Sequence, residues 1–292
     1  MAIDIAGIFR STLTLISPKL NATVVYVAKN HKLMNWNHPS TFVEKLIKLR
    51  TEDYNNNPLV KECADKYAVR DYLTRGGYSE LLNPLLAVYD NPEEIEWNEL
   101  PERFALKLNS GSGCNIICDD KSKLKEEEVI AELRKWRKQK YWLGYAEMQY
   151  KDVPVKYLLE TFLVGRDGLF PEDYKIYCFN GGPKAILYIS GRFSDSTCAG
   201  FFDTNWKYLG LPKNRLDYKS FDVDSIPTRP RSLDVMLKAA ADLSKPFPFV
   251  RMDFYDLDGE AVFGEMTFSP AGGFDVSEID IDGKSMGDLL EI

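Results

Sequence analysis

The sequence of 292 residues is poor in histidine and lacks the short motifs of several common catalytic sites. His31 and His38 are its only histidines, so a histidine-based zinc site or a Ser-His triad has little material. A GxxxxGK(S/T) phosphate loop does not occur either. Internal repeats and low-complexity blocks are also missing, which excludes solenoids and propellers. Any chemistry must therefore be sought in other patterns.

Long apolar runs and an excess of positive charge are missing as well. No window reaches the ~18 uninterrupted apolar residues of a membrane span, and Asp4 and Arg10 interrupt an N-terminus that does not resemble a signal peptide. The net charge of −7 argues against a nucleic-acid surface. Five cysteines without a CxxC pair indicate reduced thiols. We therefore expect a cytoplasmic protein without an integral membrane segment or a nucleic-acid partner.

The order of expected helices and strands is typical of an α+β protein. Thr41 and Glu44 form a capping box that opens a helix through FVEKLIKLR, and LVKECADKYAVRDYL predicts a second helix. The polar stretch NPEEIEWNELPE is a connector at about residues 90–102. Beyond it, short β-rich runs are mixed with helices at about 124–138 and in SLDVMLKAAADLS, without regular βαβ alternation.

The first chemical feature is a glycine-rich loop in FALKLNSGSGCNII. Lys107 lies just before this loop, and β-rich runs flank it on both sides. Glycines let backbone N–H groups converge on phosphate oxygens, and an ammonium group can neutralise the same oxygens. Because a strand follows the loop, this arrangement differs from a P-loop, whose phosphate meets a helix N-terminus. An ordinary hairpin with a glycine-rich turn is the alternative, and the loop taken alone favours it.

The second feature is an acidic hairpin around the turn Asp258-Gly259, in VRMDFYDLDGEAVFGEMTF. Its first strand has an apolar face (Val250, Met252, Phe254) and a polar face (Arg251, Asp253, Tyr255). Glu265 and Thr267 share a face of the second strand. Two carboxylates on adjacent strands could hold Mg²⁺, which prefers oxygen ligands and often bridges to phosphates. A solvent-exposed hairpin with acidic outer positions is the alternative.

The length of this turn decides whether the two carboxylates face the same way. A strict two-residue loop pairs Asp253 with Gly264 and turns Glu265 away, whereas a three-residue loop or one bulge places Asp253 opposite Glu265. The metal hypothesis therefore predicts the longer loop.

With these features in place, the sequence resembles the TupA-like ATP-grasp family, named for a teichuronopeptide biosynthesis protein. The resemblance rests on ordered blocks: HPSTFVEKLIKLR, CADKYAVRDYL, LPERFALKLNSGSGCNII, LLETFL, PEDYKIYCFNGGPKAI, FFDTNW and FVRMDFYDLDGEAVFGEMTFSPAGGF. It implies an ATP-grasp fold that holds the nucleotide between two α+β subdomains. The implied division is a mostly helical N-terminal region (1–100), a flap subdomain (101–160) and a metal-binding C-terminal subdomain (161–292).

The resemblance also implies roles for individual residues. ATP would be bound by the flap and its flanking strands (Lys107, Gly111, Ser112, Gly113, Glu160, Lys175). In this set Lys107 and Lys175 contact the phosphates, and Glu160 of LLETFL meets the adenine and ribose. Asp253 and Glu265 match the magnesium carboxylates, and Thr267 stands where many ATP-grasp enzymes carry a metal-binding Asn.

Two arginines complete the expected site. Arg192 and Arg251 are candidates for binding the acyl phosphate or the acid group of the acceptor, because the guanidinium fork makes paired hydrogen bonds to oxyanions. Either could instead pair with a nearby carboxylate, Asp195 or Asp253.

The activity implied by the resemblance is an ATP- and Mg²⁺-dependent carboxylate–amine ligase that works through an acylphosphate. Its partners would be a small-molecule or glycan carboxylate and an amine. We expect it to amidate a uronic acid of a bacterial capsular or cell-wall polysaccharide, near the inner face of the membrane. The alternatives are a kinase, a glycosyltransferase and a non-catalytic binding module. A metal-dependent glycosyltransferase would use a DxD-type motif, and the DLD triplet at residues 256–258 fits that pattern but falls in the predicted turn.

Overall fold

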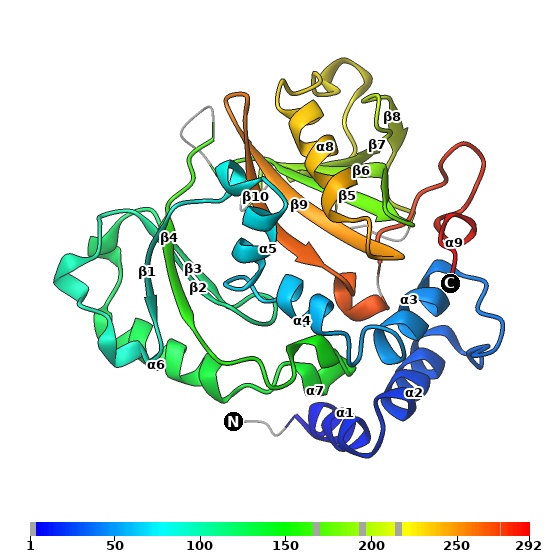
Figure 1. The fold of residues 1–292 in the computed structure, drawn as a ribbon, viewed down its shortest axis with the longest axis horizontal. Helices are drawn as coiled ribbons and strands as arrows, with labels where there is room; N and C mark the ends of the chain where they lie inside the picture. Colours follow the sequence, from blue (N-terminus) through cyan, green and yellow to red (C-terminus); the bar gives the residue numbers. More distant parts are fainter. Residues whose placement is uncertain (1–3, 166–169, 193–196, 214–217, 275) are drawn as a thin grey trace.

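The computed structural model describes residues 4–165, 170–192, 197–213, 218–274 and 276–292, which form two antiparallel sheets surrounded by helices (Figure 1). The smaller sheet has the order β1-β4-β2-β3, with strands β1 (Leu85–Tyr89), β2 (Phe104–Leu108), β3 (Asn115–Cys118) and β4 (Tyr157–Thr161). The larger has the order β10-β9-β5-β6-β7-β8, with strands β5 (Asp173–Phe179), β6 (Gly182–Ser190), β7 (Cys198–Phe202), β8 (Tyr208–Gly210), β9 (Phe249–Leu257) and β10 (Glu260–Thr267). The α+β expectation is confirmed.

Each sheet has its own hydrophobic core. Helix α6 (Glu126–Lys138) covers the smaller sheet, where Leu133 and Trp136 cluster with Phe104 and Tyr157. Helix α8 (Leu233–Leu243) covers the larger sheet, and its core also takes side chains from α3 (Phe42–Thr51), α4 (Pro58–Ala64) and α5 (Val69–Arg75). Separate cores make the two sheets separate units of packing, with the space between them left for a site.

The remaining helices lie at the periphery. Helices α1 (Ile5–Ile16) and α2 (Pro18–Asn30) form the lower edge of the molecule in Figure 1 and pack on α7 (Trp142–Tyr145), while α9 (Met286–Leu289) contacts α3. Short 3₁₀ turns complete the connections, at Ser79–Leu81, Pro92–Glu94, Trp97–Glu99, Lys121–Lys123, Met148–Tyr150, Val223–Ser225 and Pro270–Gly273.

The predicted capping box at the start of α3 is confirmed. The Thr41 hydroxyl accepts the Glu44 N–H at 3.2 Å, and the Glu44 carboxylate accepts the N–H groups of Ser40 and Thr41 at 3.0 and 3.2 Å. The Tyr26 hydroxyl of α2 donates to the same carboxylate at 2.8 Å. The capping residue Glu44 thus also links α2 to α3.

Glu44 should make the stability of the protein depend on pH. Burial acts to raise its pKa, but the donors from Ser40, Tyr26 and Thr41 outweigh burial and hold the pKa at about 2. Since the folded-state pKa is depressed, the ionised Glu44 carboxylate stabilises the folded protein fully above pH ~4.5, and this stabilisation is lost as the pH falls towards ~2. We expect Glu44→Gln to lower the free energy of unfolding at pH 7 by about 2 kcal/mol and to flatten its fall below pH ~4.5.

Chemical denaturation at several pH values measures this effect. Glu127→Gln, at an exposed position of α6, is the matched control and should leave the pH profile unchanged. An unaltered profile in Glu44→Gln contradicts the assignment.

The helix expected through LVKECADKYAVRDYL is wrong in one respect, because it is two helices. The Asp65 carboxylate accepts the N–H groups of Tyr67 and Ala68 at 2.8 and 3.4 Å, which ends α4 before α5 begins. An Asp side chain competes in this way with the helical hydrogen bonds. The break frees the Lys66 N–H, which donates to the Asn109 carbonyl of the glycine loop at 2.8 Å.

Strand β1 was also missed, since LLAVY lies in the region expected to be mostly helical. Its five residues pair with β4 and form the edge of the smaller sheet. So short a run carries little periodicity of its own, and its pairing with a strand about 70 residues later decides its structure.

The acidic hairpin places its carboxylates side by side, but not through a longer turn. Leu257 pairs with Glu260, so the loop is the two residues Asp258 and Gly259. A bulge between Phe263 and Glu265 then shifts the register and pairs Glu265 with Asp253. The pairing that the metal hypothesis requires is present, and the expectation of a longer loop is wrong. Gly264 permits the bulge, because a Cβ there would lie 3.0 Å from the carbonyl oxygen of Asp253.

Candidate active site

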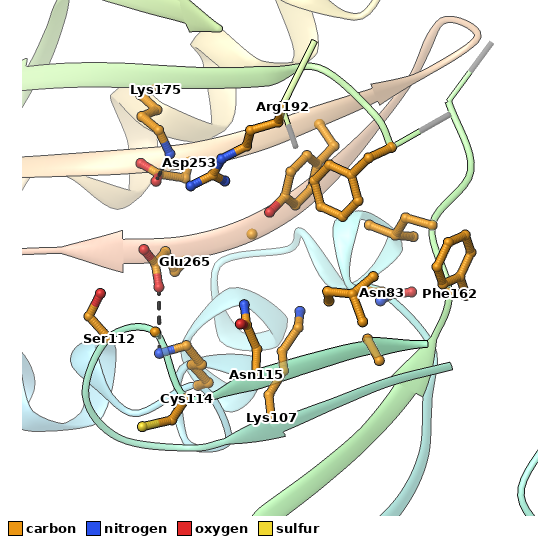
Figure 2. A pocket seen from close by; sticks show the side chains of 18 of the residues that line it. Asn83, Lys107, Ser112, Cys114, Asn115, Phe162, Lys175, Arg192, Asp253 and Glu265 are labelled. Carbon is orange, nitrogen blue, oxygen red and sulfur yellow. Dashed lines mark hydrogen bonds and ion pairs between the residues drawn. The ribbon is translucent and has the colours of Figure 1, made fainter. Parts of the chain in front are cut away.

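A cavity of about 500 Å³ lies between the two sheets and takes its walls from both. Lys107 and Asn115 reach it from β2 and β3, and Lys175, Asp253 and Glu265 reach it from β5, β9 and β10 (Figure 2). Its charged lining is mostly positive, with five cations (Lys66, Lys107, Lys175, Arg192, Arg251) against two carboxylates (Asp253, Glu265). In a chain of net charge −7, this places a local positive field where an anion can bind.

The glycine loop forms one rim of the cavity. Gly111 and Gly113 have φ angles of +84° and +77°, which residues with a Cβ rarely adopt. Asn109 anchors the start of the loop, since its side chain donates to the Pro154 carbonyl and accepts the Lys156 N–H, both at 2.9 Å. The loop is therefore a hairpin tip whose conformation depends on its glycines and whose start is fixed by the hydrogen bonds of Asn109.

Lys66 joins this loop to the acidic hairpin. Its ammonium group donates to the Gly111 carbonyl at 2.8 Å and lies 3.5 Å from a carboxylate oxygen of Glu265. Figure 2 draws the contact at Glu265 as a dashed line, with Ser112 of the loop close by. One cation thus holds the loop against the opposite wall.

Lys66→Met should therefore loosen the loop. For the ATP site that the resemblance implies, we expect a rise of about tenfold in KM, the typical effect of removing one charged hydrogen bond. The variant should keep the unfolding temperature of the parent, because the ammonium lies at the cavity edge. Steady-state kinetics measure the change, with Lys138→Met at the exposed end of α6 as the matched control. Equal KM values for both variants contradict a role for Lys66 at the loop.

The two carboxylates differ in their surroundings. Asp253, 4% exposed, receives two hydrogen bonds from Arg251 at 2.6 and 2.7 Å and one from Lys175 at 2.6 Å. Glu265 is 38% exposed and has looser ion pairs, at 3.5 Å to Lys66 and 3.7 Å to Arg251. Asp253 is held rigidly, while Glu265 is free to change its partners.

Charge keeps both groups ionised. Burial acts to raise the pKa of Asp253, but Arg251 and Lys175 outweigh it and hold the pKa at about 2. For Glu265, burial and the charge of Asp253 act to raise the pKa, but the positive charges of Lys66 and Arg251 outweigh them and leave the pKa below its usual value. Near neutral pH the site therefore offers two carboxylates as oxygen ligands.

This donor set fits magnesium. The described residues contain no group of three or more His, Cys, Asp or Glu side chains that could hold a metal ion. Asp253 and Glu265, directly opposite each other on β9 and β10, offer two carboxylates. Mg²⁺ is commonly held by one or two carboxylates, with water and substrate phosphates as its other ligands. A phosphate-bearing ligand in the cavity would complete such a set.

Of the residues expected at the site, most line the cavity (Lys107, Ser112, Gly113, Lys175, Arg192, Arg251, Asp253, Glu265). Three do not. The Glu160 carboxylate lies beside the cavity, 2.6 Å from the Lys107 ammonium, and the Gly111 carbonyl faces Lys66. The Thr267 hydroxyl donates to Glu265 at 3.3 Å and accepts from Arg251 at 3.2 Å. Their side chains or carbonyls thus contact residues that line the cavity.

The arginines take partners of their own. Arg251 pairs with Asp253, one of the two carboxylates considered for it. Arg192 lies 2.8 Å from a carboxylate oxygen of Asp173, a residue the sequence did not single out, and Asp195 is outside the described residues.

Other lining residues were missed by sequence reasoning. Lys66, Asn83, Asn115 and Tyr218 are polar examples to which the sequence assigned no role. Phe162 stands two residues after Glu160 in LLETFL, just beyond the end of β4, and an aromatic residue shortly after a strand acid is a usable signal. Figure 2 shows Phe162 at the opposite end of the cavity from Ser112 and Glu265. The cavity therefore has a charged end and a more apolar end.

Comparison with known proteins decides the family. A model of the TupA-like ATPgrasp family matches residues 44–291, which include both sheets and every residue expected at the site. The chain belongs to this family. The expected ATP-grasp fold, two α+β lobes with helices before them, is confirmed by this match together with the two sheets. No curated protein sequence matches the chain.

Solved structures of two ATP-grasp-like ligases are similar in outline. D-alanine–D-alanine ligase from Bacillus anthracis, complexed with ATP, is 16% identical, with a TM-score of 0.41 over 71% of this chain and 55% of that one. L-amino acid ligase from Bacillus licheniformis is 15% identical, with a TM-score of 0.44 over 77% of this chain and 47% of that one. The chain thus spans about half the length of these proteins. Likeness at this level carries no residue roles across.

Proposed function

We propose that this ATP-grasp protein is an ATP- and Mg²⁺-dependent ligase that joins a carboxylate to an amine. The observation that carries the proposal is the Asp253–Glu265 pair, which lies across a positively lined cavity from a glycine loop tied to it by Lys66. Carboxylates for a metal, cations for phosphates and a glycine loop are the parts that phosphoryl transfer requires.

The polarity of the cavity supports one orientation of ATP. The triphosphate belongs at the charged end, between the glycine loop and Lys175, where Asp253 and Glu265 would hold Mg²⁺. The adenine belongs at the other end, where Phe162 and Leu163 offer apolar surface and Asn83 a polar group. Aromatic and aliphatic walls with a few polar groups are typical of sites for such rings.

A smaller cavity of about 100 Å³ adjoins the charged end and supports a place for the carboxylate substrate. It shares Lys175, Tyr218 and Arg251 with the main cavity. Its other walls are mainly apolar or aromatic (Tyr177, Leu187, Ile189, Pro270, Ala271, Val276) with Ser277. An acid group beside Arg251 and Lys175 would lie next to the proposed phosphates, with the body of the substrate against the apolar walls.

In this arrangement an oxygen of the substrate carboxylate attacks the γ-phosphorus of ATP. The bond from that phosphorus to the β–γ bridging oxygen breaks, and ADP leaves with the electron pair. The amine nitrogen then attacks the acyl carbon, phosphate leaves with the C–O electrons, and the nitrogen gives up a proton. Magnesium, when bound, neutralises phosphate charge as a Lewis acid. Lys107, Lys175 and Arg251 supply further positive charge, and the glycine loop limits the access of water.

We further propose that the carboxylate belongs to a uronic acid of a bacterial surface polysaccharide or its precursor, amidated by an amine in the cytoplasm. The family of the chain is the support for this finer assignment.

Isotope transfer tests the reaction. The protein is incubated with Mg·ATP, an amine and a uronic acid labelled with ¹⁸O in its carboxylate. Ligation through an acylphosphate moves one ¹⁸O into inorganic phosphate, forms ADP and yields an amide, all dependent on the carboxylate. A stable phosphorylated sugar without free phosphate identifies a kinase instead. Turnover of a nucleotide sugar in the absence of ATP identifies a glycosyltransferase.

A further inference from the structure

Helix α1 presents its apolar side chains to solvent. Five large apolar residues lie at the helical spacing of one face and are between 55% and 76% exposed (Ile5, Ile8, Phe9, Leu15, Ile16). Only Leu13 and Thr14 of this helix are buried. Elsewhere among the described residues, exposed large apolar side chains are scattered, whereas here they form one continuous stripe. A stripe of this kind marks a surface that another body covers.

The inner side of the same helix buries Leu13 and makes polar contacts, and these contacts fix its orientation. The Thr14 hydroxyl donates to the Leu143 carbonyl of α7 at 2.7 Å, and the Asn21 amide of α2 donates to the Arg10 carbonyl at 2.7 Å. The Arg10 guanidinium lies 5.2 Å from the centre of the Tyr145 ring. Specific contacts therefore hold α1 with most of its large apolar side chains outward, the reverse of an ordinary surface helix.

The charge around this helix identifies the partner. Besides Arg10, which faces Tyr145 on the inner side, residues 1–43 contain three lysines (Lys19, Lys29, Lys32) and one acidic side chain, Asp4, within a chain of net charge −7. Lys19 and Lys32 lie 2.7 and 3.9 Å from carboxylate oxygens of Glu52 and Glu44, yet their side chains stay 49% and 55% exposed. Two further exposed leucines, Leu20 and Leu33, each follow a lysine in this segment. A second copy of the chain would bring like charges together, whereas an anionic lipid surface attracts a basic segment and accepts its apolar stripe.

We infer that α1 and α2 dock the protein on an anionic membrane surface, with the stripe of α1 in the interfacial layer. Among the described residues, no helix has the length and hydropathy to cross a membrane, so the contact is peripheral. The segment lies before the part matched by the family model, and it is on the far side of α7 from the cavity, at the lower edge in Figure 1. Docking through it therefore leaves the cavity between the sheets open, and the inference stands independently of the proposed ligase activity.

Flotation with lipid vesicles tests the docking. The protein should float with vesicles of phosphatidylcholine and phosphatidylglycerol, bind those of phosphatidylcholine alone more weakly, and lose affinity as salt rises. The double variant Ile8→Ser, Phe9→Ser should lower the partition coefficient by at least about tenfold, because two side chains no longer enter the apolar layer. Both positions are exposed, so the unfolding temperature should stay unchanged.

Val235→Ser, at an exposed apolar position of α8, is the matched control and should bind vesicles as the parent does. Absence of the parent protein from the floating fraction overturns the inference, as does equal binding by the double variant. Concentration-dependent dimers that disappear in the double variant, without vesicle binding, would assign the stripe to a second copy and also overturn it.

Discussion

Glu265→Gln is expected to reduce ADP formation by about a thousandfold with little loss of stability. Neutralising one of the two proposed metal carboxylates should remove several kcal/mol of charge stabilisation from a phosphoryl transfer, and each 1.4 kcal/mol is about tenfold in rate. The side chain is 38% exposed and its ion pairs are long, so the folded state loses little. Single-turnover formation of ADP at saturating ATP, together with thermal unfolding, measures both effects.

Two comparisons sharpen this result. Glu260→Gln, exposed at the start of the same strand, should behave as the parent. Asp253→Asn should lose as much activity but also stability, because Arg251 and Lys175 would lose a buried partner. Activity retained in Glu265→Gln at any magnesium concentration would falsify the metal assignment.

Lys175→Met is the second change with a large expected effect, a loss of about a hundredfold to a thousandfold in kcat. The ammonium of Lys175 is mostly buried and touches both cavities, so it can meet the phosphoryl group as charge develops. Removing one preorganised donor from such a position typically costs this much in rate. Methionine keeps the apolar stem, and the two hydrogen bonds from Arg251 continue to hold Asp253.

The division between kcat and KM distinguishes this role from a structural one. If Lys175 only supported Asp253, the variant would mainly alter the dependence on magnesium. A fall in kcat at saturating magnesium and ATP is the expected result. Lys184→Met, exposed on the neighbouring strand β6, controls for the loss of a positive charge. Wild-type kcat in Lys175→Met contradicts its contact with the phosphates.

Much of the local structure could be predicted because it depends on neighbours in the chain. The Thr41–Glu44 box, the strands around the glycine loop and the two faces of β9 are all set by residues within a few positions of one another. The composition of the site was visible in the same way, since its glycines, lysines and acids stand in short recognisable blocks. Resemblance over many blocks then supplied the family, which one motif could not.

Most contacts between distant parts of the chain could not be predicted from the sequence. The sequence left open whether a longer loop or a bulge would align Glu265 with Asp253, and the pairing of β9 with β10 decides for the bulge at Gly264. Lys66 reaches Glu265 only after Asp65 breaks the helix. Arg192 finds Asp173, which no local pattern singles out. Each contact depends on which elements pack together, and the sequence does not state that directly.

The sequence by itself therefore determined the α+β class, the family and the chemistry of the candidate residues. Only the tertiary structure decided that Glu160 pairs with Lys107 beside the cavity, that Lys66 links the loop to the acidic hairpin, and that α1 turns its apolar side to solvent. The physical reason is the range of the forces concerned. Propensity and capping act over one or two turns of chain, whereas burial and ion pairing act between surfaces that meet only in the folded protein.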